Sequence, residues 1–242
     1  MKILIVRHAD PDYDKDSLTE IGWIEAELLS KRMEKLDVKA FYVSPLGRTK
    51  DTANVTLRAM NREAEECQWL REFKAPMQKP NDAKPGIPWD WLPADWTGEP
   101  DAYDPERWMD SALFRGTPVP EAYRWVAGEL DKLIAKHGYV REGNYYRAVT
   151  PNEDTIVFFC HFGLESVLLS HLLHVSPMVL WHGTCAAPSS VTTVVTEERR
   201  EGIASFRVTA LGDTSHLYVA GREPSFSGRF CETYTNESQR RD

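Results

Sequence analysis

Two short apolar runs, each leading into a histidine, constrain the fold of this chain more than any other feature. The first, Lys2–Val6, is followed by Arg7 and His8, and the second, Thr155–Cys160, is followed by His161. Apolar, β-branched runs of this length are typical of parallel strands buried on both faces of a sheet. Ligands bind outside the carboxyl ends of such strands, so both histidines are expected to face a crevice. Taken alone, an arginine beside a histidine would fit an ordinary strand-end ion pair equally well.

The segments between these runs alternate between helix and strand. A capping-box pattern at Ser17–Glu20, with Thr19 as a competing N-cap, begins a helix that runs to about Leu36. Its apolar residues keep helical spacing and predict one buried face, made of Ile21, Ile24, Leu28, Met33 and Leu36. Ala40–Val43 is predicted to be a strand. Since parallel strands joined by right-handed crossovers share one direction, their carboxyl ends meet at one edge. The sequence therefore predicts an α/β fold with a mostly parallel central sheet.

A second arginine is expected at the same edge of the sheet. Residues Ser44–Ala53 follow the strand and open a helix, with Pro45 in the first turn and Arg48 close behind it. The free N–H groups and the dipole at a helix start favour an anion. We therefore predict that Arg7 and Arg48 hold one phosphate group together.

The sequence patterns of the later segments are less regular. Cys67–Phe73 is a weak strand or extended segment that contains Glu72, for which the local pattern alone favours a solvated surface carboxylate. Glu121–His137 is predicted to be a helix whose core stripe consists of Trp125, Leu130, Leu133 and Ile134. Two further strands are predicted at 189–196 and 202–209, whereas the stretch 144–147 fits either a loop or a hairpin.

Residues 74–120 lack regular periodicity. This stretch contains nine prolines and four tryptophans, which are Trp89, Trp91, Trp96 and Trp108. Prolines at this density exclude a continuous helix or a central strand, and disordered linkers are poor in aromatic residues. We therefore predict one domain over residues 1–242 with an irregular Pro/Trp-rich cap insertion at about 74–120. The excess of acidic residues in the cap would disfavour polyanionic substrates.

Composition excludes several classes of partner. A formal net charge of -8 gives a surface that repels nucleic acid and anionic membranes. The four cysteines lack metal spacing and suggest reduced thiols in a cytoplasmic protein. No apolar stretch approaches the roughly 20 residues that span a bilayer, and the first residues are predicted to be a strand, not a signal peptide. His171 and His174 lie three residues apart without a carboxylate or cysteine spaced with them, so we predict no metal site.

In its motifs the chain resembles the histidine phosphatase superfamily, which has the phosphoglycerate-mutase-like fold. The segments that carry the resemblance are Val6–Ala9, Leu18–Gly22, Ser44–Ala53, Leu70–Glu72, His161–Gly163 and Gly212–Leu217. They cover most of the chain apart from the cap and the C-terminal tail. The resemblance implies a three-layer sandwich around the central sheet and chemistry that needs no metal or other cofactor.

The resemblance also implies a role for each site residue. His8 is the expected nucleophile, kept neutral because nearby guanidinium charge lowers its pKa. His161 is expected to donate hydrogen bonds to the transferring oxygens, and Arg7 and Arg48 to neutralise their charge. Glu72 matches the family's acid, which protonates the leaving oxygen and then deprotonates the attacking water. That role requires a pKa raised by burial.

Three positions depart from the family pattern. Ala9 replaces the commoner glycine beside the phosphate, which adds only a Cβ. The acidic loop Asp10–Asp16 stands where the family's mutases carry an asparagine that touches phosphate, and this weakens the mutase interpretation. Phe162 occupies the place where a second branch carries an aspartate acid. This leaves Glu72 as the candidate acid and puts Phe162 among the expected substrate-binding residues.

Three functions remain open from the sequence. The first is a metal-independent phosphatase that hydrolyses a small-molecule phosphomonoester through a phosphohistidine on His8. The second is a phosphoglycerate-mutase-type phosphotransferase, which must shield the phosphoenzyme from water. The third is a non-catalytic phosphate-binding regulatory module. The substrate and the oligomeric state are open as well, with a homodimer as one candidate.

Overall fold

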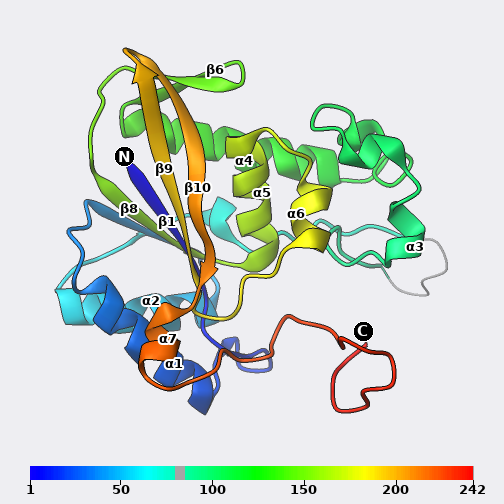
Figure 1. Ribbon diagram of the computed structural model, residues 1–242, viewed down its shortest axis with the longest axis horizontal. Helices are drawn as coiled ribbons and strands as arrows, with labels where there is room; N and C mark the ends of the chain where they lie inside the picture. The colour runs from blue at the N-terminus through cyan, green and yellow to red at the C-terminus, as the bar shows by residue number, and fades with distance from the viewer. Residues whose placement is uncertain (80–84, 242) are drawn as a thin grey trace.

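A computed structural model of the chain describes residues 1–79 and 85–241 (Figure 1). Up to residue 110 the described elements are β1 (Lys2–Arg7), β2 (Pro11–Asp12), β3 (Ser17–Leu18), α1 (Glu20–Met33), β4 (Ala40–Val43), α2 (Gly47–Met60), β5 (Glu65–Glu66), the 3-10 helix η1 (Gln68–Leu70), α3 (Pro93–Trp96), η2 (Pro100–Tyr103) and η3 (Trp108–Asp110). The remaining elements are α4 (Val119–Lys136), β6 (Tyr139–Glu142), β7 (Tyr145–Ala148), β8 (Thr155–Cys160), α5 (Phe162–Leu173), α6 (Pro177–Gly183), β9 (Val191–Arg200), β10 (Ile203–Asp213) and α7 (Ser215–Val219).

Within the described residues, the main sheet has eight strands in the order β5-β4-β8-β1-β9-β10-β7-β6. The neighbours from β5 to β1 are parallel, and those from β1 to β6 are antiparallel. The predicted α/β class is confirmed, but the sheet is mixed rather than mostly parallel. The reason is that two hairpins, β9–β10 and β6–β7, add their strands to the far side of β1.

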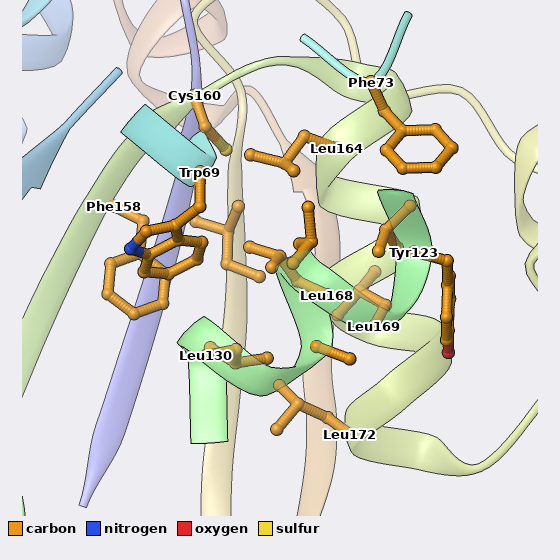
Figure 2. Close-up of a cluster of buried hydrophobic side chains, with 14 of the residues drawn as sticks. Trp69, Phe73, Tyr123, Leu130, Phe158, Cys160, Leu164, Leu168, Leu169 and Leu172 are labelled. Atoms are coloured by element: carbon orange, nitrogen blue, oxygen red, sulfur yellow. The ribbon is translucent and has the colours of Figure 1, made fainter. Parts of the chain in front are cut away.

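Helices cover both faces of this sheet and make the predicted three layers. Helices α1, α2 and α7 lie on one side, and α4, α5 and α6 lie on the other (Figure 1). Strand β1 serves both cores because its side chains alternate. Ile3 and Ile5 belong to the cluster shared with α4 and α5, part of which is drawn in Figure 2, whereas Leu4 and Val6 pack with α1 and α2. The first predicted strand is therefore buried on both faces.

Helix α1 begins after Thr19, the competing N-cap, and not after Ser17 of the capping box, because Ser17–Leu18 form β3. The helix also presents a different face to the core. The Thr19 hydroxyl caps it by accepting a hydrogen bond from the Gly22 N–H (3.0 Å). Ile21 was expected to be buried but is 53% exposed, so this part of the prediction is wrong. Instead Glu25 is buried, because its carboxylate accepts a hydrogen bond from the Asp10 N–H (2.8 Å). A polar contact from a distant loop therefore replaces apolar packing here.

Helix α4 shows a similar exception to the predicted apolar stripe. Leu130, Leu133 and Ile134 are buried as expected, but Trp125 is 51% exposed and is not part of the core. The buried positions continue upstream through Val126 and Tyr123, which places Trp125 off the stripe.

The segment 74–120 packs against the domain through its tryptophans. Trp91, Trp96 and Trp108 are buried and belong to the same cluster as the core of α4 and α5. Trp108 packs edge-on against Tyr123 of α4, with ring centroids 4.9 Å apart. Residues 80–84, which include Pro80 of the predicted cap, lie outside the described residues.

Two other features bear on the predictions from composition. Within residues 1–79 and 85–241, no helix combines the length and apolarity needed to cross a bilayer. The four cysteines all lie in this described part of the chain and are unpaired.

Candidate active site

The two histidines meet at one edge of the sheet because β1 and β8 are adjacent and parallel. Arg7 lies opposite Cys160 in the register, so His8 and His161 are the first residues after the paired strands. The His8 N–H donates to the Cys160 carbonyl (3.0 Å), which extends the ladder by one residue. The two imidazole centroids are 5.1 Å apart, with an angle of 59° between the ring planes. Both side chains are almost completely buried.

Arg7 supplies a buried positive charge beside this pair. Its Nη1 donates to the Ala186 carbonyl oxygen (2.5 Å), which fixes the guanidinium. The C-terminal segment packs on the same group. A Cβ on Gly228 would lie only 2.7 Å from both terminal nitrogens of Arg7, and Gly228 adopts a φ of +90°. Glycine is therefore required at this point of the tail for two independent reasons.

Arg48 reaches the same pocket from the first turn of α2. Its Nη1 binds Asp16 Oδ1 (2.6 Å), and its Nη2 donates to Nδ1 of His161 (3.3 Å). The other oxygen of Asp16 accepts a hydrogen bond from the Gly47 N–H (2.7 Å). One carboxylate from the acidic loop therefore positions both Arg48 and the helix start that carries it.

The surroundings of His8 select one protonation state. Its Nδ1 lies 2.8 Å from the Ala9 carbonyl oxygen, which can only accept, so Nδ1 carries a proton. Burial, followed by the charge of Arg7, places the pKa of His8 well below its ordinary value. A neutral imidazole with a proton on Nδ1 keeps the lone pair of Nε2 free.

His161 is held by two hydroxyl groups. Its Nε2 lies 2.8 Å from Ser44 Oγ and 3.1 Å from Thr49 Oγ1. Burial, followed by the nearby His8, places the pKa of His161 well below its ordinary value. Because the Arg48 guanidinium can only donate, Nδ1 of His161 accepts, and the proton of the neutral ring lies on Nε2, facing the two hydroxyl groups.

Glu72 lies just after η1 and reaches the first turn of α5. Its Oε1 accepts hydrogen bonds from the Phe73 N–H (2.9 Å) and the Leu164 N–H (3.2 Å). Burial raises the pKa of this carboxyl, and those two N–H groups together with Arg7 and Arg48 offset part of the effect. Glu72 is therefore not the fully solvated carboxylate that its local sequence favours.

Phe162 lies beside an aromatic residue from the cap. It is the first residue of α5 and is partly exposed. The Trp89 ring packs edge-on against it, with centroids 6.2 Å apart. Tyr13 lies over the Arg48 guanidinium at 5.4 Å. Aromatic rings therefore lie beside both Arg48 and the start of α5.

The structure therefore brings Arg7, His8, Arg48, Glu72, His161 and Phe162 into one region of the molecule. It also adds residues that sequence reasoning missed. Ser44 and Thr49 lie inside a quoted motif, which was the available signal for them. Asp16 was grouped with a solvated acidic loop and Trp89 with the general packing of the cap, and neither carried a local signal. Lys74 adds positive charge that lowers the pKa values of both histidines.

His171 and His174, the two histidines that lie three residues apart, bind other side chains. His171 Nε2 pairs with Asp131 (2.9 Å), and His174 Nε2 pairs with the Asn144 amide (3.2 Å). Across residues 1–79 and 85–241, no three side chains of the metal-binding types His, Cys, Asp and Glu converge.

The pocket combines two guanidinium groups, two neutral imidazoles and one partly buried carboxyl. This set suits a tetrahedral oxyanion, because the arginines supply charge and geometry while Nε2 of His8 is free to attack phosphorus. The carboxyl can give or take a proton beside it.

The chain is similar to known proteins both in sequence and in fold. The chain is 32% identical over 101 residues to a 2,3-bisphosphoglycerate-dependent phosphoglycerate mutase of Thermoplasma acidophilum, a match that covers 36% of this chain and 50% of the mutase. It thus spans half the length of this relative.

Solved structures share the fold over nearly the whole chain. A mycobacterial glucosyl-3-phosphoglycerate phosphatase superposes with a TM-score of 0.60 at 16% identity, covering 88% of this chain and 99% of that one. A phosphoserine phosphatase of Entamoeba histolytica gives 0.56 at 16% identity, covering 89% and 98%. The model of the histidine phosphatase superfamily (branch 1) matches residues 3–209. This chain therefore belongs to the histidine phosphatase superfamily, branch 1.

Proposed function

We propose that this protein is a phosphatase that hydrolyses a small-molecule phosphomonoester through a phosphohistidine intermediate on His8. The observation that carries the proposal is the geometry around Nε2 of His8. The opposite ring nitrogen is committed to the Ala9 carbonyl, and the second imidazole lies 5.1 Å away between centroids. A free lone pair surrounded by cationic and hydrogen-bonding groups is what in-line attack on a phosphoryl group requires.

The first half-reaction transfers the phosphoryl group to the enzyme. Nε2 of His8 forms a bond to phosphorus while the bond from phosphorus to the ester oxygen breaks. Glu72 gives its proton to that oxygen, so the leaving group departs as a neutral alcohol. The arginines and His161 stabilise the charge on the three transferring oxygens.

The second half-reaction reverses these roles. Glu72, now a carboxylate, takes a proton from a water molecule as the water oxygen bonds to phosphorus. The bond from phosphorus to Nε2 breaks, and inorganic phosphate leaves. General acid–base help of this kind contributes on the order of 10²–10⁴-fold in rate.

The direction of the pKa shifts predicts a bell-shaped pH profile. His8 must be neutral to attack, and its lowered pKa moves the acidic limb to low pH. Glu72 must carry a proton in the first step, and its raised pKa moves the alkaline limb upward. The two shifts together widen the pH range over which both groups are in the required state.

Three similar proteins inform the substrate class. The two phosphatases of similar fold are named for phosphoserine and for glucosyl-3-phosphoglycerate, both small phosphorylated metabolites that carry a carboxylate. The mutase relative favours a second candidate, transfer of phosphate between hydroxyl groups of one metabolite. The acidic loop at Asp10–Asp16 and the named phosphatases favour hydrolysis.

A trapping experiment tests the proposal. The protein is quenched during turnover with ³²P-labelled phosphomonoesters, and the label is located by peptide mapping. We expect acid-labile label on His8 and none in His8→Ala, which should also lose hydrolysis by at least 10³-fold while still binding phosphate. Phosphate transferred to a second substrate hydroxyl, with little free phosphate released, would identify a mutase. Phosphate binding without label or turnover would identify a regulatory module.

Leaving-group dependence tests the role of Glu72. Glu72→Gln should slow hydrolysis of alkyl phosphates more than that of aryl phosphates, because a phenolate leaves without being protonated. Equal slowing of both classes would contradict the assignment of Glu72 as the acid.

A further inference from the structure

Trp89 is a cap residue that lies beside Glu72, and its indole is held at two points. Its Nε1–H donates to the Phe73 carbonyl oxygen (2.7 Å), and its ring packs edge-on against Phe162 at an interplanar angle of 89°. Phe73 follows Glu72 in the chain, and Phe162 opens the helix whose first turn donates to Glu72. The indole is therefore fixed to both segments that hold this carboxyl.

Gly163 shows how close the indole and the carboxyl are. A Cβ built on this glycine would lie 2.4 Å from Nε1 of Trp89 and 2.6 Å from its Cδ1. The same point is 2.7 Å from Oε1 of Glu72. The absence of a side chain at Gly163 thus leaves a gap that the indole edge and the carboxylate oxygen share. Since the indole N–H is used by Phe73, the indole adds apolar surface beside Glu72.

Several titratable and charged groups surround Glu72. Arg7 of β1 and Arg48 of α2 favour the carboxylate form, and so do the two backbone N–H groups that bind it. Cys160 of β8 and Glu165 of α5 also interact with it electrostatically. His8 and His161 interact with the same two arginines and with Lys74. Burial outweighs the opposing groups, so whichever residue excludes water from Glu72 controls its protonation.

We propose that Trp89 is a positioning residue for the general acid: its indole excludes water from the Glu72 carboxyl and thereby holds the acidic form that protonates the leaving group. This inference rests on the proposed function, because it assigns the environment of the proposed acid. It also gives the cap a chemical role. The scaffold supplies the nucleophile and the arginines, whereas the insertion supplies the dry surroundings of the acid.

The test compares pH profiles of two tryptophan variants in the cap. In Trp89→Ala, water reaches Glu72, so the alkaline limb of kcat should move to lower pH. At pH 7.5, kcat for an alkyl phosphate should fall about tenfold, while kcat for an aryl phosphate should change little. Trp89→Phe retains an aromatic wall and should restore most of the rate. Trp96→Ala is the control, because Trp96 packs on His182 (5.0 Å between centroids) and Tyr103, away from the pocket.

A direct titration separates this inference from the proposed function. The Glu72 carboxyl can be followed by ¹³C NMR, with Glu72→Gln used to assign its signal. We expect its midpoint to be lower in Trp89→Ala than in the natural chain and unchanged in Trp96→Ala. A protein that titrates this way but hydrolyses no phosphomonoester would retain the inference about burial and lose the proposed function.

The opposite result overturns the inference. If Trp89→Ala and Trp96→Ala have the same pH profile, and the Glu72 titration does not move, then Trp89 only packs the cap. Should Trp89→Ala fail to fold, Trp89→Gln serves instead, because its amide can still donate to Phe73 while bringing water to Glu72. An unmoved Glu72 titration in folded Trp89→Gln would be equally decisive against the proposal.

Discussion

Asp16 binds two parts of the phosphate pocket at once. Its carboxylate holds the Arg48 guanidinium at 2.6 Å and the Gly47 N–H at 2.7 Å. Arg48 in turn reaches Nδ1 of His161. A single loop residue thus fixes where one of the two cationic groups can meet a phosphate. Charge-assisted hydrogen bonds of this type contribute about 1.5–3 kcal/mol each.

Asp16→Asn should therefore weaken phosphate binding more than it slows turnover. We expect the inhibition constant of inorganic phosphate to rise about tenfold, because 1.4 kcal/mol corresponds to a factor of ten in affinity. Steady-state inhibition measures this constant. The matched control is Asp12→Asn in the same loop, since Asp12 pairs with the exposed Lys15 (2.7 Å). Equal or tighter phosphate binding in Asp16→Asn would show that Asp16 does not position Arg48.

The site residues differ in how well sequence could identify them. Arg7, His8 and His161 were predicted to converge because they directly follow strong strand patterns. Asp16 and Trp89 were not predicted, since each acts on a residue brought near it by folding. The acidic loop and the proline-rich insertion contain no local pattern that indicates which distant residue each will contact.

At the scale of elements, Trp108 and Trp125 differ in how far their side chains are buried. Trp108 of η3 is completely buried between Phe114, Tyr123 and Trp181. Trp125 of α4 is half exposed. The same residue type therefore has opposite surroundings on two neighbouring elements.

Trp108→Ala should lower the free energy of unfolding by about 3–5 kcal/mol, the usual cost of removing a buried large aromatic side chain. Trp125→Ala should change it by no more than about 0.5 kcal/mol. Urea denaturation followed by circular dichroism measures both values. Comparable losses in the two variants would mean that the cap does not share the core of the domain.

Sequence periodicity predicted elements better than it predicted their faces. Strands β1, β4 and β8 were found because each is a short apolar run. Ile21 and Trp125 were assigned to the core because helical spacing allowed it, but the contacts that set the orientation of each helix come from distant segments. The stretch 144–147 fitted a loop or a hairpin and lies in the hairpin of β6 and β7, but its pairing of Tyr146 with Ala204 of β10 was not predicted. Such long-range pairings leave no trace in local sequence.

At the scale of the whole molecule, a buried acid outside the proposed mechanism couples folding to pH. Glu165 of α5 is 2% exposed, and burial raises its pKa from 4.5 to about 7. The folded state then binds more protons than the unfolded state between these two values. Stability therefore falls as pH rises through this window, and the loss is complete above about pH 7.

Glu165→Gln removes this pH-dependent loss. Relative to the natural chain, its free energy of unfolding should increase by about 2 kcal/mol between pH 5 and pH 7 and level off near pH 8. Urea denaturation at pH 5, 6, 7 and 8 measures the difference. Glu129→Gln, on the surface beside Lys132, controls for the substitution itself. A difference that stays constant across the four pH values would show that Glu165 does not titrate in the folded protein.

The central position of β1 in the sheet affects when this strand can pair during synthesis. Lys2 pairs with Thr155 on one side and with Val195 on the other, so β1 is synthesised roughly 150 to 190 residues before the two strands that flank it. At about 5–20 residues per second, roughly 190 residues of further synthesis take on the order of 10–40 s. An apolar nascent segment that is unpaired for this long is a natural client for ribosome-associated chaperones. The candidate site can be completed only after β8 and the His161 that follows it have been synthesised.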